Sequence, residues 1–146
     1  MDEQQTNAER LLHLLEQLRP QLLGPAFKKL HDLDLSPSHL RVLRTLHDAQ
    51  SLPMKALAGQ LCIKPPSVTS LTRRLVETGL VGRRTHADDS RVVLIELTAA
   101  GQELHHQIYE EQLQRMGQLL ARLSPAEQQT FLDLLERAIT PEGKHS

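Results

Sequence analysis

Aromatic residues are scarce in this chain of 146 residues, which contains two Phe, one Tyr and no Trp. A hydrophobic core must therefore be built from Leu, Val, Ile, Ala and Met. Cysteine is scarcer still, because Cys62 is the single one in the sequence. This excludes an intramolecular disulfide framework and fits a reducing compartment. The length suits one ordinary domain with a core of its own.

Long apolar runs are also missing from the sequence. No stretch approaches the roughly 20 residues that are needed to span a bilayer. The first ten residues, MDEQQTNAER, are polar and acidic, unlike a signal peptide. We therefore expect a soluble, cytoplasmic protein without a membrane partner.

Motifs of catalysis and metal binding are absent as well. The sequence has no phosphate loop, nucleophile elbow or paired-carboxylate motif, so we expect neither an enzyme nor a cofactor. No His-x-x-x-His pattern occurs. The adjacent His105 and His106 point about 100° apart on a helix, so they cannot clamp one ion by themselves. We expect no metal site, although a site assembled in space from His13, His31, His39 or His105 stays open.

Charge is unevenly distributed, although the formal net charge is only -1. The window from Pro53 to Thr85 holds six basic residues and one acidic residue, Glu77, and so carries +5. The window from Gln102 to Thr140 holds three Arg and six acidic residues, and so carries -3. A basic middle between acidic ends suits a chain whose centre contacts phosphate and whose ends contact each other. Chance clustering on a solvated face is the alternative.

Leucine periodicity predicts helices at both ends of the chain. Seven leucines between Leu11 and Leu23 cover more than one stripe of a first helix, which indicates a partner helix. Pro20 and the pair Gly24-Pro25 predict a kink between Arg19 and Pro25. At the other end, Thr98 is expected to cap a long helix, and the capping box from Ser124 to Glu127 to begin a last one.

The middle of the chain predicts a helix-turn-helix followed by a hairpin. Ser36-Pro37 begins one helix, and the spacing of Met54, Leu57, Ala58 and Leu61 predicts the next. The turn Cys62-Ile63-Lys64 leads to a third helix, which begins at Pro65 and ends at Gly79. The segments Leu80 to Thr85 and Val92 to Leu97 are rich in β-branched residues, and a polar turn joins them. The predicted fold is mainly α, with a small β-hairpin wing.

The segments LAGQLCIKPPSVTSLTRRLVETGLVGRR and DDSRVVLIELTAAG resemble the MarR (multiple antibiotic resistance regulator) family of winged-helix transcription regulators. Asp89-Ser90-Arg91 matches the Asp-x-Arg unit of the family's wing, and the stretch from Leu97 to Gly101 matches its Leu-Thr-x-x-Gly. His86-Ala87 departs from the pattern, because Asp-Pro is common there, and this puts the shape of the wing turn in question. The resemblance covers nearly the whole chain, since the leucine-rich ends match the family's dimerisation helices.

The resemblance implies a single MarR-type domain over residues 1–146, with a winged-helix lobe at 36–98 and dimerisation helices at 8–31 and 99–139. It implies a homodimer that binds a pseudo-palindromic operator in double-stranded DNA, acts as a repressor and responds to a small effector such as an aromatic anion. The competing function is a helical interaction module that uses the winged helix for protein contacts. Such a module predicts an apolar or uncharged face on the third helix, where this sequence is polar and basic.

Six residues are candidates for DNA contact. Short hydroxyl side chains can bind base edges, and Arg can bind guanine bidentately. The N-terminal residues of a recognition helix usually approach the bases, and a narrow minor groove attracts Arg. The candidate base readers are Ser67, Thr69 and Ser70, and the candidates for guanine, phosphate or minor-groove contact are Arg73, Arg74 and Arg91. For the five candidates on the helix, the alternative is a solvated face without DNA contact.

Three further interpretations concern single residues or a pocket. We expect Asp89 to brace the wing by pairing with Arg73 or Arg74, because a carboxylate that faced DNA would repel phosphate. Cys62 could sense oxidants only if its pKa were depressed, and lone cysteines are usually buried and inert. Effectors of the family usually lie between the dimer interface and the lobe. We therefore expect a pocket near His13, Phe27, His31, His39 and Tyr109.

Overall fold

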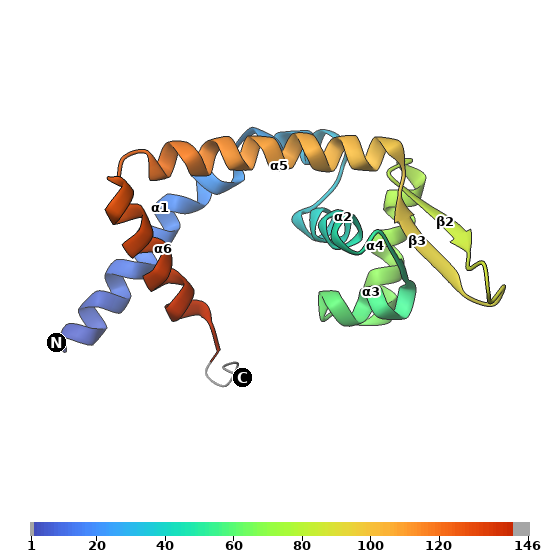
Figure 1. Cartoon of the computed structure of the whole chain (residues 1–146), viewed down its shortest axis with the longest axis horizontal. Coiled ribbons are helices and arrows are strands. Elements are labelled where there is room, and N and C mark those ends of the chain that lie inside the picture. Colours follow the sequence, from blue (N-terminus) through green and yellow to red (C-terminus); the bar gives the residue numbers. More distant parts are fainter. Residues whose placement is uncertain (1, 142–146) are drawn as a thin grey trace.

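The computed structural model describes residues 2–141, apart from the side chains of residues 23, 25 and 26. In this part of the chain the elements follow one another as α1 (Glu3–Asp32), α2 (Pro37–Ala49), β1 (Ser51–Pro53), α3 (Met54–Leu61), α4 (Pro65–Glu77), β2 (Val81–Thr85), β3 (Val93–Leu97), α5 (Ala99–Leu120) and α6 (Pro125–Ile139). The predicted fold, mainly α with a β-hairpin wing, is confirmed. The long α5 carries the lobe of α2, α3, α4 and the wing at one end, and α6 with the first half of α1 at the other (Figure 1).

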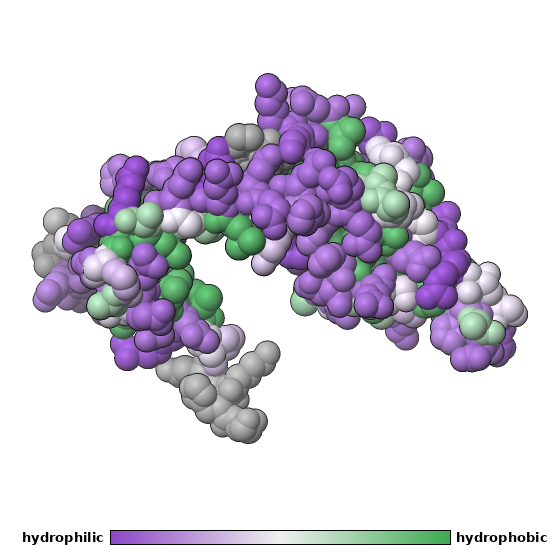
Figure 2. All heavy atoms as spheres, turned by 45° about the horizontal axis from the view of Figure 1, so that its top comes forward, coloured by the Kyte–Doolittle hydropathy of each residue, from purple (hydrophilic) through white to green (hydrophobic). Residues whose placement is uncertain are grey.

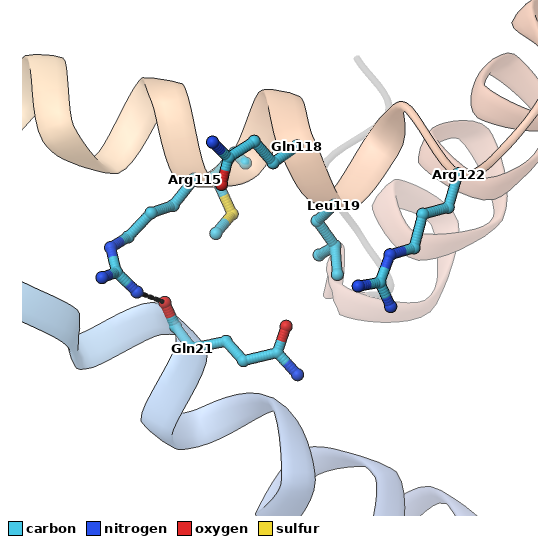
Figure 3. A pocket seen from close by; sticks show the side chains of 6 residues that line it. Gln21, Arg115, Gln118, Leu119 and Arg122 are labelled. Carbon is cyan, nitrogen blue, oxygen red and sulfur yellow. Dashed lines mark hydrogen bonds between the residues drawn. The ribbon is translucent and has the colours of Figure 1, made fainter.

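Helix α1 is kinked where the sequence predicts it. Gly24 has a non-helical backbone, with φ 32° and ψ -157°. The carbonyl of Gln21 would normally accept from the backbone four positions on, but Pro25 has no N–H to donate. Arg115 of α5 supplies the missing donor, since its Nη1 lies 3.0 Å from that carbonyl oxygen (Figure 3). The kink is thereby tied to α5.

Local capping chemistry sets the starts of the later helices. Thr98 accepts the Gly101 N–H at 3.1 Å and so begins α5. Ser124 and Glu127 form the predicted capping box of α6, with bonds of 2.8 and 3.2 Å. Gly79 follows α4 with φ 77°, the left-handed conformation that glycine adopts without strain. These predictions are confirmed.

The sheet has three antiparallel strands in the order β1-β3-β2. The predicted hairpin pairs Val81 with Leu97 and Thr85 with Val93. The sequence did not indicate β1, whose three residues end in Pro53 and show no alternation of apolar and polar side chains. Strand β1 forms because β3 offers it a second edge, with Leu52 opposite Ile95.

The hydrophobic core lies in the lobe and extends beyond residues 36–98 at both ends. Leu30 of α1 and Ile108 of α5 are each buried within the same cluster as Leu43, Leu57 and Leu75. Helix α6, in contrast, buries no residue. Among residues 2–141, none of the helices combines the length and the apolar character that crossing a bilayer requires.

Gly101 lies where the wing joins α5, and Gly101→Ala should lower the free energy of unfolding by about 1–3 kcal/mol. An added Cβ would overlap the carbonyl oxygen of Leu80, which is held in place because it accepts the Thr98 N–H at 3.1 Å. Gly117→Ala is the matched control, since a Cβ there meets no described atom within 4 Å. It should stabilise α5 by up to about 1 kcal/mol. Chemical denaturation at one protein concentration compares them, and equal stabilities would contradict the prediction.

Candidate nucleic-acid interface and effector cavity

Helix α4 presents one stripe of short polar and basic side chains to solvent. Ser67, Ser70 and Arg73 are exposed and follow one another at three-residue spacing. Val68 and Leu75 are fully buried on the opposite side, while Leu71 is half-buried. Thr72 is fully buried as well, and its hydroxyl lies 3.7 Å from the sulfur of Met54.

Thr69 and Arg74 of α4 are engaged within the chain. The hydroxyl of Thr69 donates to the carbonyl of Pro65 at 3.0 Å, the back-bond that helical Thr commonly makes. Arg74 reaches the turn between α1 and α2, where its Nη2 donates to the carbonyl of Leu33 at 3.1 Å and lies 3.7 Å from Asp34 Oδ2. Arg74 therefore joins α4 to the preceding turn, while Arg73 faces solvent.

The wing turn is fixed by its own side chains. Asp89 Oδ1 accepts the backbone N–H of Arg91 at 3.0 Å and lies 3.3 Å from Arg91 Nε. The expected pairing of Asp89 with Arg73 or Arg74 is wrong, because Asp89 is bonded within the turn and Arg74 binds Leu33 and Asp34. At the point of departure from the family pattern, His86 Nδ1 accepts the Asp88 N–H at 3.1 Å.

Ion pairing divides the basic residues of the middle window into two groups. Arg74 and Arg84 are paired with carboxylates, Arg84 with Glu96 at 2.8 Å. The exposed members that form no ion pair among residues 2–141 are Lys55, Lys64, Arg73 and Arg83. Arg91 at the wing is paired with Asp89 at 3.3 Å, yet 90% of its side chain is exposed. The uncompensated charge therefore lies on α3, α4 and the wing.

A cavity of about 360 Å³ lies between α2 and α5. It is lined by Arg44, His47 and Asp48 of α2, and by His105 and Tyr109 of α5. The rings of His47 and His105 stack with centroids 4.1 Å apart, and those of His105 and Tyr109 with centroids 6.0 Å apart. A neighbouring cavity of about 490 Å³ shares Arg44 and Tyr109 and is otherwise lined by Leu22, Gln112, Leu113 and Met116.

Burial lowers the pKa of His105 below the ordinary value of 6.5, and the neighbouring His47 and Arg44 lower it further. Asp48 acts in the opposite direction. The resting site therefore combines a permanent cation with a buried, neutral imidazole and flat rings. Such a site can hold a small planar anion.

The comparisons with known proteins agree with this architecture. The profile of the MarR family matches residues 35–93. The HTH-type transcriptional regulator YhbI of Bacillus subtilis is 37% identical over 106 residues, a match that covers 68% of this chain and 69% of YhbI. The chain belongs to the MarR family of transcriptional regulators.

Two other relatives of this MarR-family chain are informative. The homoprotocatechuate degradative operon repressor of Escherichia coli is 30% identical over 106 residues, covering 73% of this chain and 72% of that repressor. The crystal structure of NadR in complex with 4-hydroxyphenylacetate has a TM-score of 0.63 and 31% identity, and covers 88% of this chain and 91% of NadR.

The pocket residues predicted from the sequence do not gather in this MarR-family structure. Within the described residues Tyr109 lines both cavities, whereas His13 is exposed beside Gln17 and His31 is exposed near the end of α1. Phe27 packs against the core. His39 accepts the backbone N–H of Ser36 at 2.9 Å at the start of α2, and burial with the nearby Arg74 charge lowers its pKa.

The sequence missed Arg44, His47 and His105 as cavity residues. Arg44 and His47 are three residues apart and so share a face of α2, while His105 and Tyr109 are four apart and share a face of α5. The sequence shows this periodicity, but the periodicity does not indicate which two helix faces pack against each other.

Cys62 and the histidines are the candidates for redox and metal chemistry. Cys62 is exposed in the helix-turn-helix turn, and its Sγ lies 3.7 Å from the carbonyl oxygen of Gly59. In the part of the chain that the structure describes, no cluster of three or more His, Cys, Asp or Glu could hold a metal ion.

Proposed function

We propose that this MarR-family chain is a repressor that binds a pseudo-palindromic DNA operator as a homodimer and responds to a small aromatic anion. The observation that carries the proposal is the exposed stripe Ser67, Ser70 and Arg73 on α4, next to unpaired cations on α3 and the wing. A protein-interaction module would instead need an apolar or uncharged face at this place.

Helix α4 is proposed to enter the major groove with its N-terminal half. Ser67 and Ser70 are then the foremost base readers, and Arg73 binds guanine or phosphate. Thr69 and Arg74 remain part of the proposed interface because of their positions on α4. Their polar groups, however, already bind within the chain, Thr69 to the carbonyl of Pro65 and Arg74 to the turn between α1 and α2. Arg91 at the wing tip is proposed to contact the minor groove or its phosphates.

The terminal helices are proposed to form the dimer interface. The whole of α6 leaves its apolar residues exposed, including Leu135 at 45% and Ile139 at 71%. Leu11 and Leu15 of α1 are exposed in the same way, while the side chain of Leu23 lies outside the described residues. Apolar residues gather over this end of the molecule in Figure 2. A monomer rarely exposes so much apolar surface, and a second copy would cover it.

The cavity between α2 and α5 is proposed to be the effector site. Arg44 offers a guanidinium to a carboxylate, and His105 and Tyr109 offer flat rings to an aromatic group. NadR was solved with 4-hydroxyphenylacetate, a ligand of this kind. Helix α2 belongs to the lobe and α5 leads to the proposed interface, so a ligand that favours one arrangement of the two would shift the separation of the α4 helices.

Selection of bound DNA from a random pool tests the repressor proposal. A dimer with two α4 helices should enrich a two-fold symmetric site, with half-sites about 10 base pairs apart. Binding should weaken steeply with salt, because phosphate contacts release counterions. A pool without an enriched sequence, or binding that salt leaves unchanged, would contradict the proposal and favour the interaction module.

Arg73 and Arg74 form a matched pair on one helix, and Arg73→Ala should weaken operator binding much more than Arg74→Ala. Arg73 is free to contact DNA, so its loss should cost about 1.5–3 kcal/mol per protomer and flatten the salt slope. Arg74 is held by Leu33 and Asp34, so its loss should act mainly on stability, by at most about 1 kcal/mol for exposed pairs. Fluorescence anisotropy with operator DNA at several salt concentrations measures both. Equal losses would contradict this assignment.

A further inference from the structure

We propose that the cavity between α2 and α5 binds its anion together with one proton, which the buried His105, stacked on His47, takes up. The inference rests on the proposed effector function of this cavity and adds its regulation. Binding of the anion becomes tighter as the pH falls.

The geometry brings three groups that are, or can become, positive to one small space. Arg44 and His47 lie on neighbouring turns of α2, and the ring of His47 stacks on His105 with an interplanar angle of 21°. His105 is only 6% exposed, whereas His47 is exposed and its Nδ1 lies 3.4 Å from Gln102 Oε1. Asp48 is the single carboxylate among the residues that line this cavity.

The surroundings of His105 in the free protein disfavour a proton on its ring. Two imidazolium rings at 4.1 Å would repel each other, Arg44 would repel both, and burial penalises a charge on His105. These effects lower the pKa of His105. Further titratable or charged groups on the packed elements include Glu103, His106, Tyr109, Glu110 and Arg115 on α5, His39 and Arg41 on α2, the Lys29–Glu111 pair between α1 and α5, and the Arg84–Glu96 pair between β2 and β3. Both of those pairs are neutral as units.

A carboxylate bound at Arg44 has the opposite effect and favours a proton on His105. An opposite charge within about 4–6 Å favours the charged form of a titratable group, so the pKa of His105 rises on binding. Between the lower pKa of the free protein and the higher pKa of the complex, each anion that binds brings a proton from solvent. Because the complex then holds more protons than the free protein, affinity rises as pH falls, by at most about tenfold per pH unit for one proton.

Proton uptake has a simple chemical meaning for the cavity. An anion and a proton together have the composition of the undissociated acid. The occupied site gains no net charge, and His105 becomes a charged donor to the ligand or to Tyr109. His105 is therefore the element that lets this positively lined cavity accept a carboxylate without adding an uncompensated charge.

Calorimetry of the full-length dimer with 4-hydroxyphenylacetate tests the inference. Titrations at pH 7.0 in PIPES and in Tris, which differ in ionisation enthalpy, give the number of protons taken up. We expect uptake of up to one proton per site, and a Kd that falls about 3- to 10-fold between pH 7.5 and pH 6.5. His105→Gln should still bind through Arg44, but without uptake and with a Kd independent of pH. His106→Gln, which changes the adjacent residue outside the cavity, should retain both the proton uptake and the pH dependence of the Kd.

The outcomes separate the two proposals. Binding without proton uptake, or uptake that persists in His105→Gln, would overturn the proton-linked site and leave the effector cavity standing. No binding of the probe at either pH would overturn both, while the operator proposal would still be judged by DNA selection. NMR titration of the His105 ring in the wild type, with and without the probe, covers the case in which the variant does not fold. An unchanged pKa would overturn the inference.

Discussion

Leu135→Glu should dissociate the dimer at concentrations at which the parent chain is fully dimeric, and operator binding should be lost with it. Leu135 lies on α6, a helix without a buried residue of its own. If both copies of this leucine are covered in the dimer, their contribution is about 1.5–3 kcal/mol each. The substitution should therefore weaken the dimer about 100- to 10,000-fold.

Gln129→Glu provides the control for this prediction, because it adds the same charge to an exposed polar position of the same helix. Sedimentation equilibrium of both variants gives the dimer Kd, and anisotropy gives operator affinity. A Leu135→Glu protein that remains dimeric would exclude this face of α6 from the interface. Truncation after Leu123, which removes α6 altogether, should cause aggregation or loss of folding, since the apolar residues of α1 would stay uncovered.

Arg91→Ala should reduce operator affinity at least about 100-fold for the dimer, while thermal stability and dimerisation hardly change. A hydrogen bond to a charged group contributes about 1.5–3 kcal/mol, and the dimer loses two. The side chain is exposed at the wing tip, where it contributes little to folding. Loss of phosphate neutralisation should also lower the salt slope by about 0.9 for each protomer. An unchanged salt slope would mean that Arg91 does not contact phosphate.

Asp89→Ala tests whether the wing is pre-organised by its own carboxylate. Asp89 holds both the backbone N–H and the side chain of Arg91, so its removal should free that arginine and weaken binding about 2- to 10-fold per protomer. Asp88→Ala removes the same charge, but its carboxylate makes no hydrogen bond among the described residues. If the carboxylates merely repel DNA, both variants should bind more tightly. Tighter binding by Asp89→Ala would therefore contradict the proposal that Asp89 braces the wing.

Local chemistry explains why so much of the fold could be predicted. Thr98, Ser124 and Gly79 act on backbone groups within a few residues of themselves, so their effect can be read from the sequence alone. The kink at Gly24-Pro25 is of the same kind, because it follows from a missing N–H. The exposed stripe of α4 was also predictable, since periodicity separates its two faces.

Contacts between distant segments explain what could not be predicted. Arg74 looked free on a helical wheel, but its partners Leu33 and Asp34 are about forty positions away in sequence and meet it only in the fold. Strand β1 and the cavity at Arg44 likewise depend on which segments pack together. Asp89 is the exception, because its partner is only two residues away and Asp commonly stabilises turns through such local bonds.

The length of α5 determines how small an effector-induced change needs to be. Its 22 residues span about 33 Å, from the winged-helix end to the end that carries α6. The cavity lies beside α5 at the junction with α2, so α5 can act as a lever with its fulcrum at the ligand. A rotation of only about 5° there would displace the far end, about 11 to 15 residues away, by about 1.5–2 Å, given the 1.5 Å rise per residue. In a symmetric dimer both α5 helices would move together. A ligand would therefore need to alter side-chain packing only slightly to bring the two α4 helices out of register with adjacent turns of the DNA double helix.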